Sequence, residues 1–363
     1  MTDPTTSLAI PHNRLTFGDA ESRAAAEAVA SGQWAGGPRV QALERGLQHR
    51  AGRAHAIGVA SGLAALRLGL KALGVAQGDE VIIPAYACVA LANAVLALGA
   101  SPVSADVAED WNLDPRAVTA AHTDRTRAVI AVNTFGVPAA VARLRGASVS
   151  VIEDCAHGFG LATPTGVLGG RADVAVLSFH ATKLLGAGEG GAVVTDRADA
   201  AEVLRAWRDY EDQPPDGTRL NDKLSDIHAA IALCQLERLD AMIAARAARA
   251  QRYQARLTPT AQRTGAFRLP PAPAPRIWYR YAIELTDRAA VEVVEAMRRF
   301  GVGAARPVTD WRLPGGRPCP VADRAYLRVV SLPLYPTLRD DEQDRVCEVL
   351  DAVLARPVRA HER

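Results

Sequence analysis

A chain of 363 residues is longer than one compact domain usually is, so we expect a large domain and a small one. Its 42 basic and 40 acidic residues leave a net charge of +2, which gives no reason to expect nucleic-acid or membrane partners. Small molecules and other protein chains are the partners that remain.

The N-terminal sequence and the cysteines indicate the cellular compartment to expect. The first residues, MTDPTTSLAIPHNR, lack the basic and apolar regions of a signal peptide. The most apolar stretch, residues 88–100, is too short to span a bilayer and is expected to be a buried helix. The five cysteines are far apart and form no C-x-x-C pair, so the sequence predicts no zinc site or disulfide framework. We expect a cytoplasmic protein with reduced thiols.

From about residue 55, predicted strands alternate with helical patterns. Residues 55–60 are a predicted strand, and the leucines at 63, 66, 70 and 73 follow at helical spacing. Further strands are expected at 79–86, 101–107, 127–136 and 149–158. Nearly continuous apolar strands separated by helices are typical of a mainly parallel sheet covered on both faces.

In such sheets, ligands bind just beyond the carboxyl ends of the strands. The polar residues that follow predicted strands are therefore the first candidates for a site. They are Ser61, Tyr86, Asp106, Asn133, Asp154 and His157.

The second half of the chain is organised differently. Residues 223–257 are expected to form one long helix, and the proline-rich residues 269–275 a linker or rigid surface segment. A smaller α+β unit of strand, helix, strand and helix follows. We therefore predict a large domain at residues 1–240 and a small C-terminal domain at residues 241–363.

The stretch KLLGAGEGGAVVTD, which begins at Lys183, matches the dinucleotide-binding pattern G-x-G-x-x-G. That pattern requires a strand directly before the glycines and a helix after them. Here several residues separate the predicted strand 172–180 from the first glycine, and a β-branched run follows the last one. The sequence thus favours a lysine-bearing loop between two strands. The alternative interpretation, a nicotinamide-dependent dehydrogenase, is supported by the glycines alone.

Lys183 has suitable neighbours in the sequence. Ser178 and His180 precede it, and Asp154 ends an apolar strand upstream. Residues 60–62 form a strand-to-helix turn, where free N–H groups favour a phosphate. A lysine that forms a Schiff base, an acid that keeps the pyridine nitrogen protonated and a phosphate cup are what pyridoxal 5′-phosphate (PLP) requires.

The segment SFHATKLLGAGEGGAVVTD also resembles the lysine motif of the DegT/StrS family of PLP-dependent sugar aminotransferases. Other similar segments follow in family order; they are residues 31–44, 61–86, 98–107, 151–160, 221–240 and 330–346. The resemblance implies the aspartate-aminotransferase fold (fold type I). This α/β fold has a large domain with a mainly parallel, seven-stranded sheet between helices, and a small α+β domain.

The resemblance also implies roles for single residues. Lys183 would carry the Schiff base, Asp154 would pair with the pyridine nitrogen, and His157 would lie near the ring. Ser178 and the backbone around Gly62, Leu63 and Ala64 would bind the phosphate. Asn221 would reach the phosphate of the neighbouring subunit's cofactor, which implies a homodimer with shared active sites.

Some positions depart from the family pattern. Leu63 stands where a hydroxyl residue is usual, and Cys88 where an aromatic residue commonly stacks on the ring, for which Tyr86 could compensate. In the predicted small domain, WYRY (278–281) and Arg306-Pro307 replace histidine-containing motifs. The further candidates are His180 for the cofactor, and Tyr86, Glu189, Lys223, Arg280 and Arg306 for the substrates, since anionic substrates need cations.

The sequence therefore predicts a ping-pong aminotransferase with Lys183 as general base and then general acid. By resemblance, the donor would be glutamate or glutamine and the acceptor a nucleotide-linked keto sugar or a keto-cyclitol, in polysaccharide or antibiotic biosynthesis. The alternative is a DegT-like regulatory or partner protein that retains the fold and PLP. Only the missing hydroxyl at position 63 favours that alternative.

Overall fold

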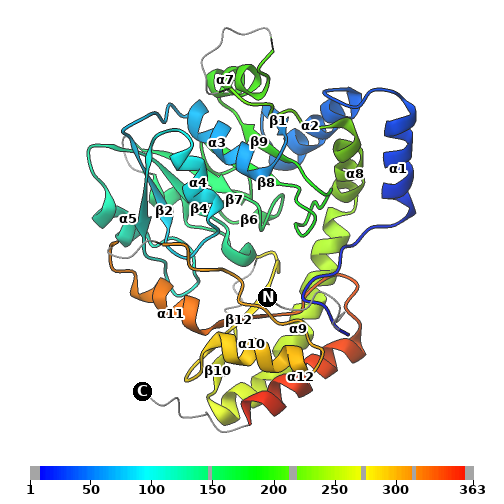
Figure 1. The fold of residues 1–363 in the computed structure, drawn as a ribbon, viewed down its shortest axis with the longest axis vertical. Coiled ribbons are helices and arrows are strands. Elements are labelled where there is room, and N and C mark those ends of the chain that lie inside the picture. The colour runs from blue at the N-terminus through cyan, green and yellow to red at the C-terminus, as the bar shows by residue number, and fades with distance from the viewer. Residues whose placement is uncertain (1–8, 146–148, 212–218, 271–274, 313–315, 356–363) are drawn as a thin grey trace.

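The computed structural model describes residues 9–145, 149–211, 219–270, 275–312 and 316–355. Figure 1 shows a larger body built around a central sheet and a smaller unit of helices and short strands below it. The long helix α9 runs from one to the other.

The central sheet has seven strands in the order β1-β9-β8-β5-β4-β2-β3. In that order they span His55–Val59, Gly191–Thr195, Val174–Ser178, Ser150–Asp154, Thr126–Val132, Glu80–Pro84 and Ser101–Ala105. Strand β9 is antiparallel to both of its neighbours, and all other adjacent pairs are parallel. The predicted mainly parallel sheet is confirmed.

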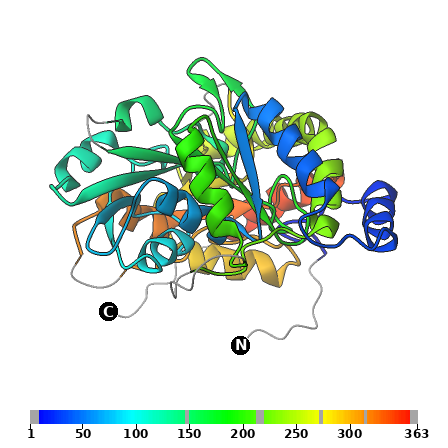
Figure 2. The same ribbon diagram turned by 90° about the horizontal axis from the view of Figure 1, so that it is seen from above.

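Helices cover both faces of this sheet (Figure 2). Helices α3 (Gly62–Ala72), α4 (Ala90–Leu96) and α7 (Ala198–Arg208) share one core cluster with Val174 and Val176. The intervening Ala175 and Leu177 face a second cluster with α2 (Pro38–Ala51) and α8 (Asp226–Glu237). Because successive side chains point to opposite faces, a sheet buried on both sides needs the continuous apolar strands seen in the sequence.

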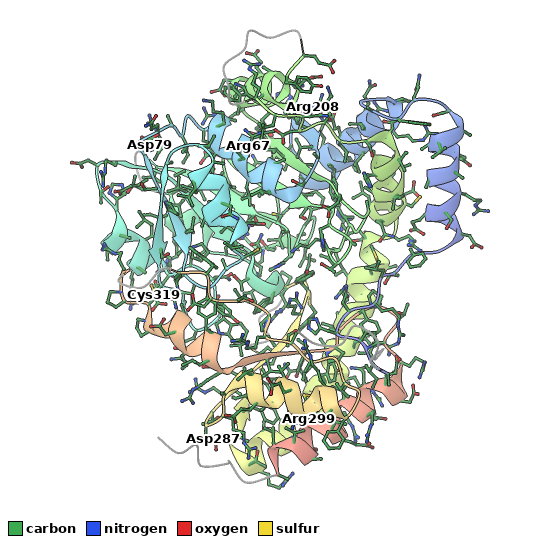
Figure 3. All side chains as sticks on the ribbon, in the orientation of Figure 1. Arg67, Asp79, Arg208, Asp287, Arg299 and Cys319 are labelled. Atoms are coloured by element: carbon green, nitrogen blue, oxygen red, sulfur yellow. The ribbon has the colours of Figure 1, made fainter. Side chains whose placement is uncertain are left out.

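The remaining elements of the larger body lie around this frame. Their bounds are Asp19–Ala30 for α1, Pro115–Ala121 for α5, Val141–Leu144 for α6, Thr134–Gly136 for the 3₁₀ turn η1, and Ala162–Thr163 and Gly166–Val167 for the hairpin strands β6 and β7. Helix α5 packs on β3, α6 packs on β4 and β5, and α1 packs against α8. Buried Arg67 of α3 forms an ion pair with Asp222, which joins this helix to the segment before α8 (Figure 3).

The prediction of one helix over residues 223–257 is wrong. Two helices, α8 and α9 (Leu239–Thr264), meet at Arg238, whose guanidinium is bonded to Glu21 of α1. Helix α8 packs on α1 and α2, whereas α9 packs on the smaller unit. No residue pattern signals this break, because alanine, arginine and leucine favour helix on both sides of it.

The smaller unit is built on an antiparallel sheet of β10 (Phe267–Arg268), β11 (Tyr281–Leu285) and β12 (Val329–Leu332). Its helices are α10 (Ala290–Arg299), α11 (Pro320–Arg328) and α12 (Asp340–Leu354). The N-terminal Ile10 packs in the same core and pairs with Val302. Of the predicted proline-rich linker, residues 271–274 lie outside the described residues. Within the described ranges, no helix has the length and apolarity needed to cross a bilayer.

Candidate active site

Lys183 lies in a compact loop between β8 and β9. Backbone hydrogen bonds close the loop on itself: Ala187 N–H donates to Phe179 C=O at 2.8 Å, and Ala181 N–H to Gly188 C=O at 2.9 Å. A Cβ added at Gly186 would lie 2.5 Å from the Ala181 carbonyl oxygen, so the loop requires glycine there. Strand β9 follows this loop where the dinucleotide pattern demands a helix.

The lysine side chain is half-buried and faces the carboxyl ends of the parallel strands. Its Nζ lies 5.3 Å from the centroid of the Tyr279 ring. Its positive charge favours the ionised form of the Asp154 carboxyl group and the neutral form of the His157 ring. The fold therefore brings Lys183, Asp154 and His157 together, as the sequence predicted.

Asp154 ends strand β5 and is buried. Burial raises the pKa of this carboxyl group, while the Ala156 N–H, which donates to Oδ1 at 2.9 Å, and the Lys183 charge act in the opposite direction. Among the described residues, no donor reaches the other carboxylate oxygen. A buried carboxylate with one unused oxygen can pair with a protonated ring nitrogen.

His157 is held between two aromatic rings. It stacks on Tyr279 with ring centroids 4.3 Å apart, and on Phe135 with centroids 6.0 Å apart. The Phe135 N–H donates to its Nδ1 at 3.4 Å. Burial, and then the charges of Lys183 and Arg280, hold its pKa well below the usual value. His157 is therefore neutral and can donate a hydrogen bond from Nε2.

The N-terminus of α3 and the Ser178 hydroxyl form a cradle of donors. Ser61 Oγ accepts the Ala64 N–H at 3.1 Å, and among the described residues nothing accepts the N–H groups of Gly62 and Leu63. A Cβ added at Gly62 would lie 2.9 Å from Ser178 Oγ, so glycine keeps the cradle open. A phosphate fits this arrangement of free N–H groups, hydroxyl and helix dipole. These residues suit the phosphate of PLP.

The residues near this cradle that were noted as departing from the family pattern, and Tyr86, differ in their exposure to solvent. Leu63 is 43% exposed, and Cys88 is also exposed. Tyr86 is buried, and its hydroxyl has no hydrogen-bond partner. Burial raises the pKa of Tyr86 well above its usual value, although the charges of Arg280 and Arg306 oppose this shift. Both arginines are thus near Tyr86, and Arg306 is exposed.

Of the four other predicted residues, three are exposed and the fourth is already paired with carboxylates. His180 is exposed and its Nδ1 is 3.0 Å from Thr182 Oγ1, and Glu189 is exposed on the glycine loop. Asn221 is exposed, and its side chain accepts the Lys223 N–H at 3.4 Å. The Lys223 amine pairs with two carboxylates, Asp209 at 2.9 Å and Glu211 at 3.1 Å. Their roles in binding stay predictions.

Sequence reasoning missed two residues at this site. Tyr279 lies in the WYRY segment, which was noted only as a departure, and its ring contacts both Lys183 and His157. His12 is brought in by the N-terminal segment, and its ring contacts Arg280. Nothing in the local sequence around position 12 signals this, because the contact spans most of the chain.

Comparison with known proteins agrees with this site. Residues 16–351 match the model of the DegT/DnrJ/EryC1/StrS aminotransferase family. The chain belongs to this family. It is therefore a PLP-dependent aminotransferase of fold type I, and the fold, the enzyme class and the cofactor implied by the lysine motif are confirmed.

Solved structures that resemble this aminotransferase cover nearly all of it. DesV of S. venezuelae is 30% identical over 93% of this chain and 95% of its own, with a TM-score of 0.82. TlmJ from Streptoalloteichus hindustanus is 27% identical over 95% and 99%, with a TM-score of 0.88. NtdA from Bacillus subtilis, solved with bound cofactor PMP, is 26% identical over 96% and 88%, with a TM-score of 0.85.

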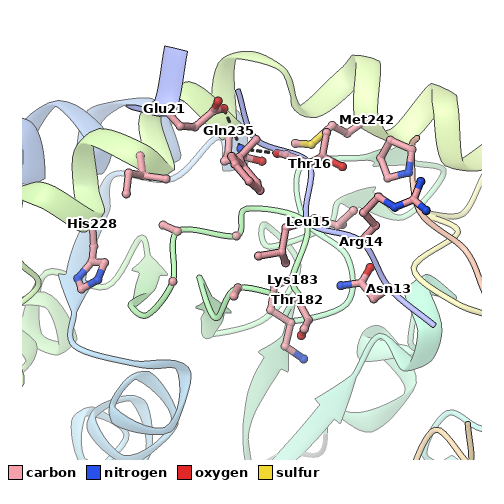
Figure 4. Close-up of a pocket in the computed structure, with 18 of the residues that line it drawn as sticks. Asn13, Arg14, Leu15, Thr16, Glu21, Thr182, Lys183, His228, Gln235 and Met242 are labelled. Atoms are coloured by element: carbon pink, nitrogen blue, oxygen red, sulfur yellow. Dashed lines mark hydrogen bonds between the residues drawn. The ribbon is translucent and has the colours of Figure 1, made fainter. Parts of the chain in front are cut away.

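The aminotransferase also has a cavity of about 470 Å³ beside the lysine loop. The N-terminal segment, the loop and helices α8 and α9 line it, and Figure 4 shows Lys183 across the cavity from Gln235 and Glu21. Neither Asp154 nor Ser178 lines this space. The cavity therefore reaches Lys183 but neither the buried carboxylate nor the Ser178 hydroxyl.

Proposed function

We propose that this enzyme transfers the amino group of glutamate or glutamine to the keto group of a nucleotide-linked sugar or a keto-cyclitol. Its membership of the aminotransferase family and the likeness of its lysine motif to those of sugar aminotransferases support this acceptor class. The observation that carries the proposal is the grouping of Lys183, Asp154 and His157 beside the donor cradle at Ser178.

The residues present fit the cofactor, and each has a distinct task. Asp154 would hold a proton on the ring nitrogen, the α3 N-terminus and Ser178 would bind the phosphate, and His157 would donate to an oxygen on the ring. When bound, PLP withdraws electrons from the donor carbon next to the nitrogen. The Lys183 amine holds the cofactor at rest and is freed when the donor amine takes its place. It would then take the proton from that carbon and pass it to C4′ of the cofactor.

We also propose a homodimer in which Asn221 serves the partner's site. Its exposed side chain and the exposed Leu63 at the phosphate cradle support a neighbour at this surface. The test is to mix two inactive variants, Lys183→Ala and Asn221→Ala. Hybrid dimers of these variants contain one intact site, so activity should return on mixing; no return, or a monomer in sedimentation, would contradict the proposal.

A regulatory or partner protein is the second candidate, because Leu63 removes a hydroxyl from the phosphate cradle. Borohydride reduction followed by peptide mass analysis separates the two. We expect a cofactor adduct on Lys183, absent in Lys183→Ala, and conversion of the unreduced protein to its pyridoxamine form by glutamate or glutamine. An adduct without conversion by any amino donor would favour the regulator.

A further inference from the structure

Arg280 is a cation at the site without an anionic partner. Its Nη1 donates to a His12 ring nitrogen at 3.1 Å, and its guanidinium carbon lies 5.2 Å from the centroid of the Tyr279 ring. Its Nε is buried and has no hydrogen-bond partner. Among the described residues, no acidic side chain forms an ion pair with it. The charge of Arg280 is therefore oriented but not neutralised.

The orientation comes from a neutral histidine. Burial, followed by the charges of Arg280 and Arg298, lowers the pKa of His12 to about 3, so its ring is uncharged at neutral pH. Its Nε2 also lies 2.9 Å from Ser331 Oγ of β12. The segment that carries His12 is anchored to the smaller unit, because Gly303 N–H donates to Ile10 C=O at 2.8 Å. A neutral acceptor fixes the guanidinium without competing for an anion.

A second arginine adds to the positive charge here. Buried Arg246 of α9 donates to the carbonyl oxygens of Tyr279 at 3.1 Å and Leu334 at 3.0 Å, and its Nε has no partner. Arg246 and Arg280 both line a cavity of about 60 Å³, which Thr182, the neighbour of Lys183, also lines. Within the described part of the chain, no acidic residue lines this cavity. Arg246 is buried and Arg280 is half-buried. A cation removed from water without a counter-charge is unfavourable, so a bound anion would stabilise the cavity.

The position and size of the cavity indicate which class of anion it would bind. Arg280 and Lys183 lie on the same tyrosine ring, at 5.2 Å and 5.3 Å from its centroid. A donor amino acid that reacts at Lys183 carries its carboxylates only a few bonds from its nitrogen. A space of about 60 Å³ suits one carboxylate but not a nucleoside diphosphate. The planar guanidinium matches a carboxylate in two-point hydrogen bonding.

We propose that Arg280, oriented by His12 and Ser331, binds a carboxylate of the amino donor and so determines which donors the enzyme accepts. This inference rests on the proposed aminotransferase function. The other predicted cations are less suitable: Lys223 is already paired with two carboxylates, and Arg306 is exposed.

The direct test uses two unreactive probes, glutarate and inorganic pyrophosphate, with calorimetric binding and with competition against glutamate. We expect Arg280→Gln to weaken glutarate binding and to raise the KM for glutamate by about 10- to 100-fold, with a smaller change in kcat. Pyrophosphate binding should not change. Arg299→Gln is the matched control, because Arg299 is an exposed arginine of the same unit, on α10 (Figure 3).

The positioning residue has its own test. His12→Gln, which keeps a hydrogen-bond acceptor, should retain most of the glutarate affinity, whereas His12→Leu should lose it about as Arg280→Gln does. Thermal unfolding of each variant shows whether a loss comes from unfolding instead, and Arg280→Lys, which keeps the charge, should recover part of the affinity.

Three outcomes would overturn the proposal: an unchanged glutamate KM in Arg280→Gln, no binding of glutarate by the wild type, or a loss confined to pyrophosphate. The last would assign Arg280 to a phosphate of the acceptor. Glutarate binding is measured without turnover, so it also distinguishes the two proposals. If wild-type Lys183 forms no borohydride adduct but glutarate binding still depends on Arg280, the aminotransferase function fails and the subsite stands.

Discussion

Tyr279 stacks on His157 with their ring centroids 4.3 Å apart and their planes 13° from parallel. Tyr279 comes from the segment before β11 of the smaller unit, and His157 follows β5 of the central sheet. The stack therefore joins the two parts of the molecule at the site. Phe135 of the larger body stacks on the same histidine, with ring centroids 6.0 Å apart.

Tyr279→Ala should lower the free energy of unfolding by about 3 kcal/mol, because it removes a buried aromatic ring and the stacking of that ring on His157. Tyr279→Phe should lower it by less than about 1 kcal/mol, since the hydroxyl makes only a 3.4 Å hydrogen bond to Thr182 C=O. Urea denaturation of the two variants measures the difference. Equal losses would mean that the hydroxyl, and not the ring, stabilises the contact.

Gly136 controls how closely the two parts approach. It has φ +86°, and a Cβ added there would lie 1.8 Å from the Ile277 carbonyl oxygen. Gly74 has a similar φ of +79° but open space around it. We expect Gly74→Ala to cost about 1–2 kcal/mol of stability from the backbone alone, and Gly136→Ala to cost clearly more and to reduce activity. Denaturation and activity assays of both variants would reveal the clash; equal effects would rule it out.

Asp154 should give the cofactor-free protein a distinctive pH dependence. Burial raises the pKa of its carboxyl group, so the folded state holds a proton that the unfolded chain releases near pH 3.9. The free energy of unfolding therefore falls as pH rises from about 3.9 through the folded-state pKa. Cofactor-free Asp154→Asn should be more stable than cofactor-free wild type at pH 7, by an amount that vanishes at low pH, yet less active.

A matched control for this behaviour is Asp199, at the exposed start of α7. Its hydrogen bond with Arg197 lowers the pKa of Asp199 to about 2, so its contribution is present above pH 3.9 and is lost as pH falls. Asp199→Asn should therefore shift stability in the opposite direction at neutral pH. Thermal unfolding from pH 3 to pH 8 compares the two. The interpretation of Asp154 fails if its variant is less stable than wild type at pH 7.

Ser178→Ala should weaken PLP binding by about 10- to 100-fold, because one hydroxyl is lost from the phosphate cradle. Ser61→Ala should act differently. Its hydroxyl caps the Ala64 N–H, so its loss should lower stability by about 1 kcal/mol. Titration of the cofactor by absorbance and thermal unfolding of the free protein separate these effects. Unchanged PLP affinity in Ser178→Ala would exclude the hydroxyl from the phosphate site.

Much of this site could be predicted from local sequence. Asp154 and Ser178 end neighbouring parallel strands, so they must lie at the same edge of the sheet, and Lys183 follows within five residues. The strand on each side of the glycine loop was predictable from its β-branched residues. The sequence by itself thus determined the sheet, the lysine loop and the enzyme class.

Only the tertiary structure decided which distant parts of the chain pack against the sheet and the lysine loop. Arg238, at the break between α8 and α9, pairs with Glu21, and His12 and Tyr279 contact Arg280 and His157. Periodicity reports which face of an element is buried, but not which distant segment covers it. The contacts that orient Arg280 join residues far apart in the chain, and so they appear only after both parts have folded together.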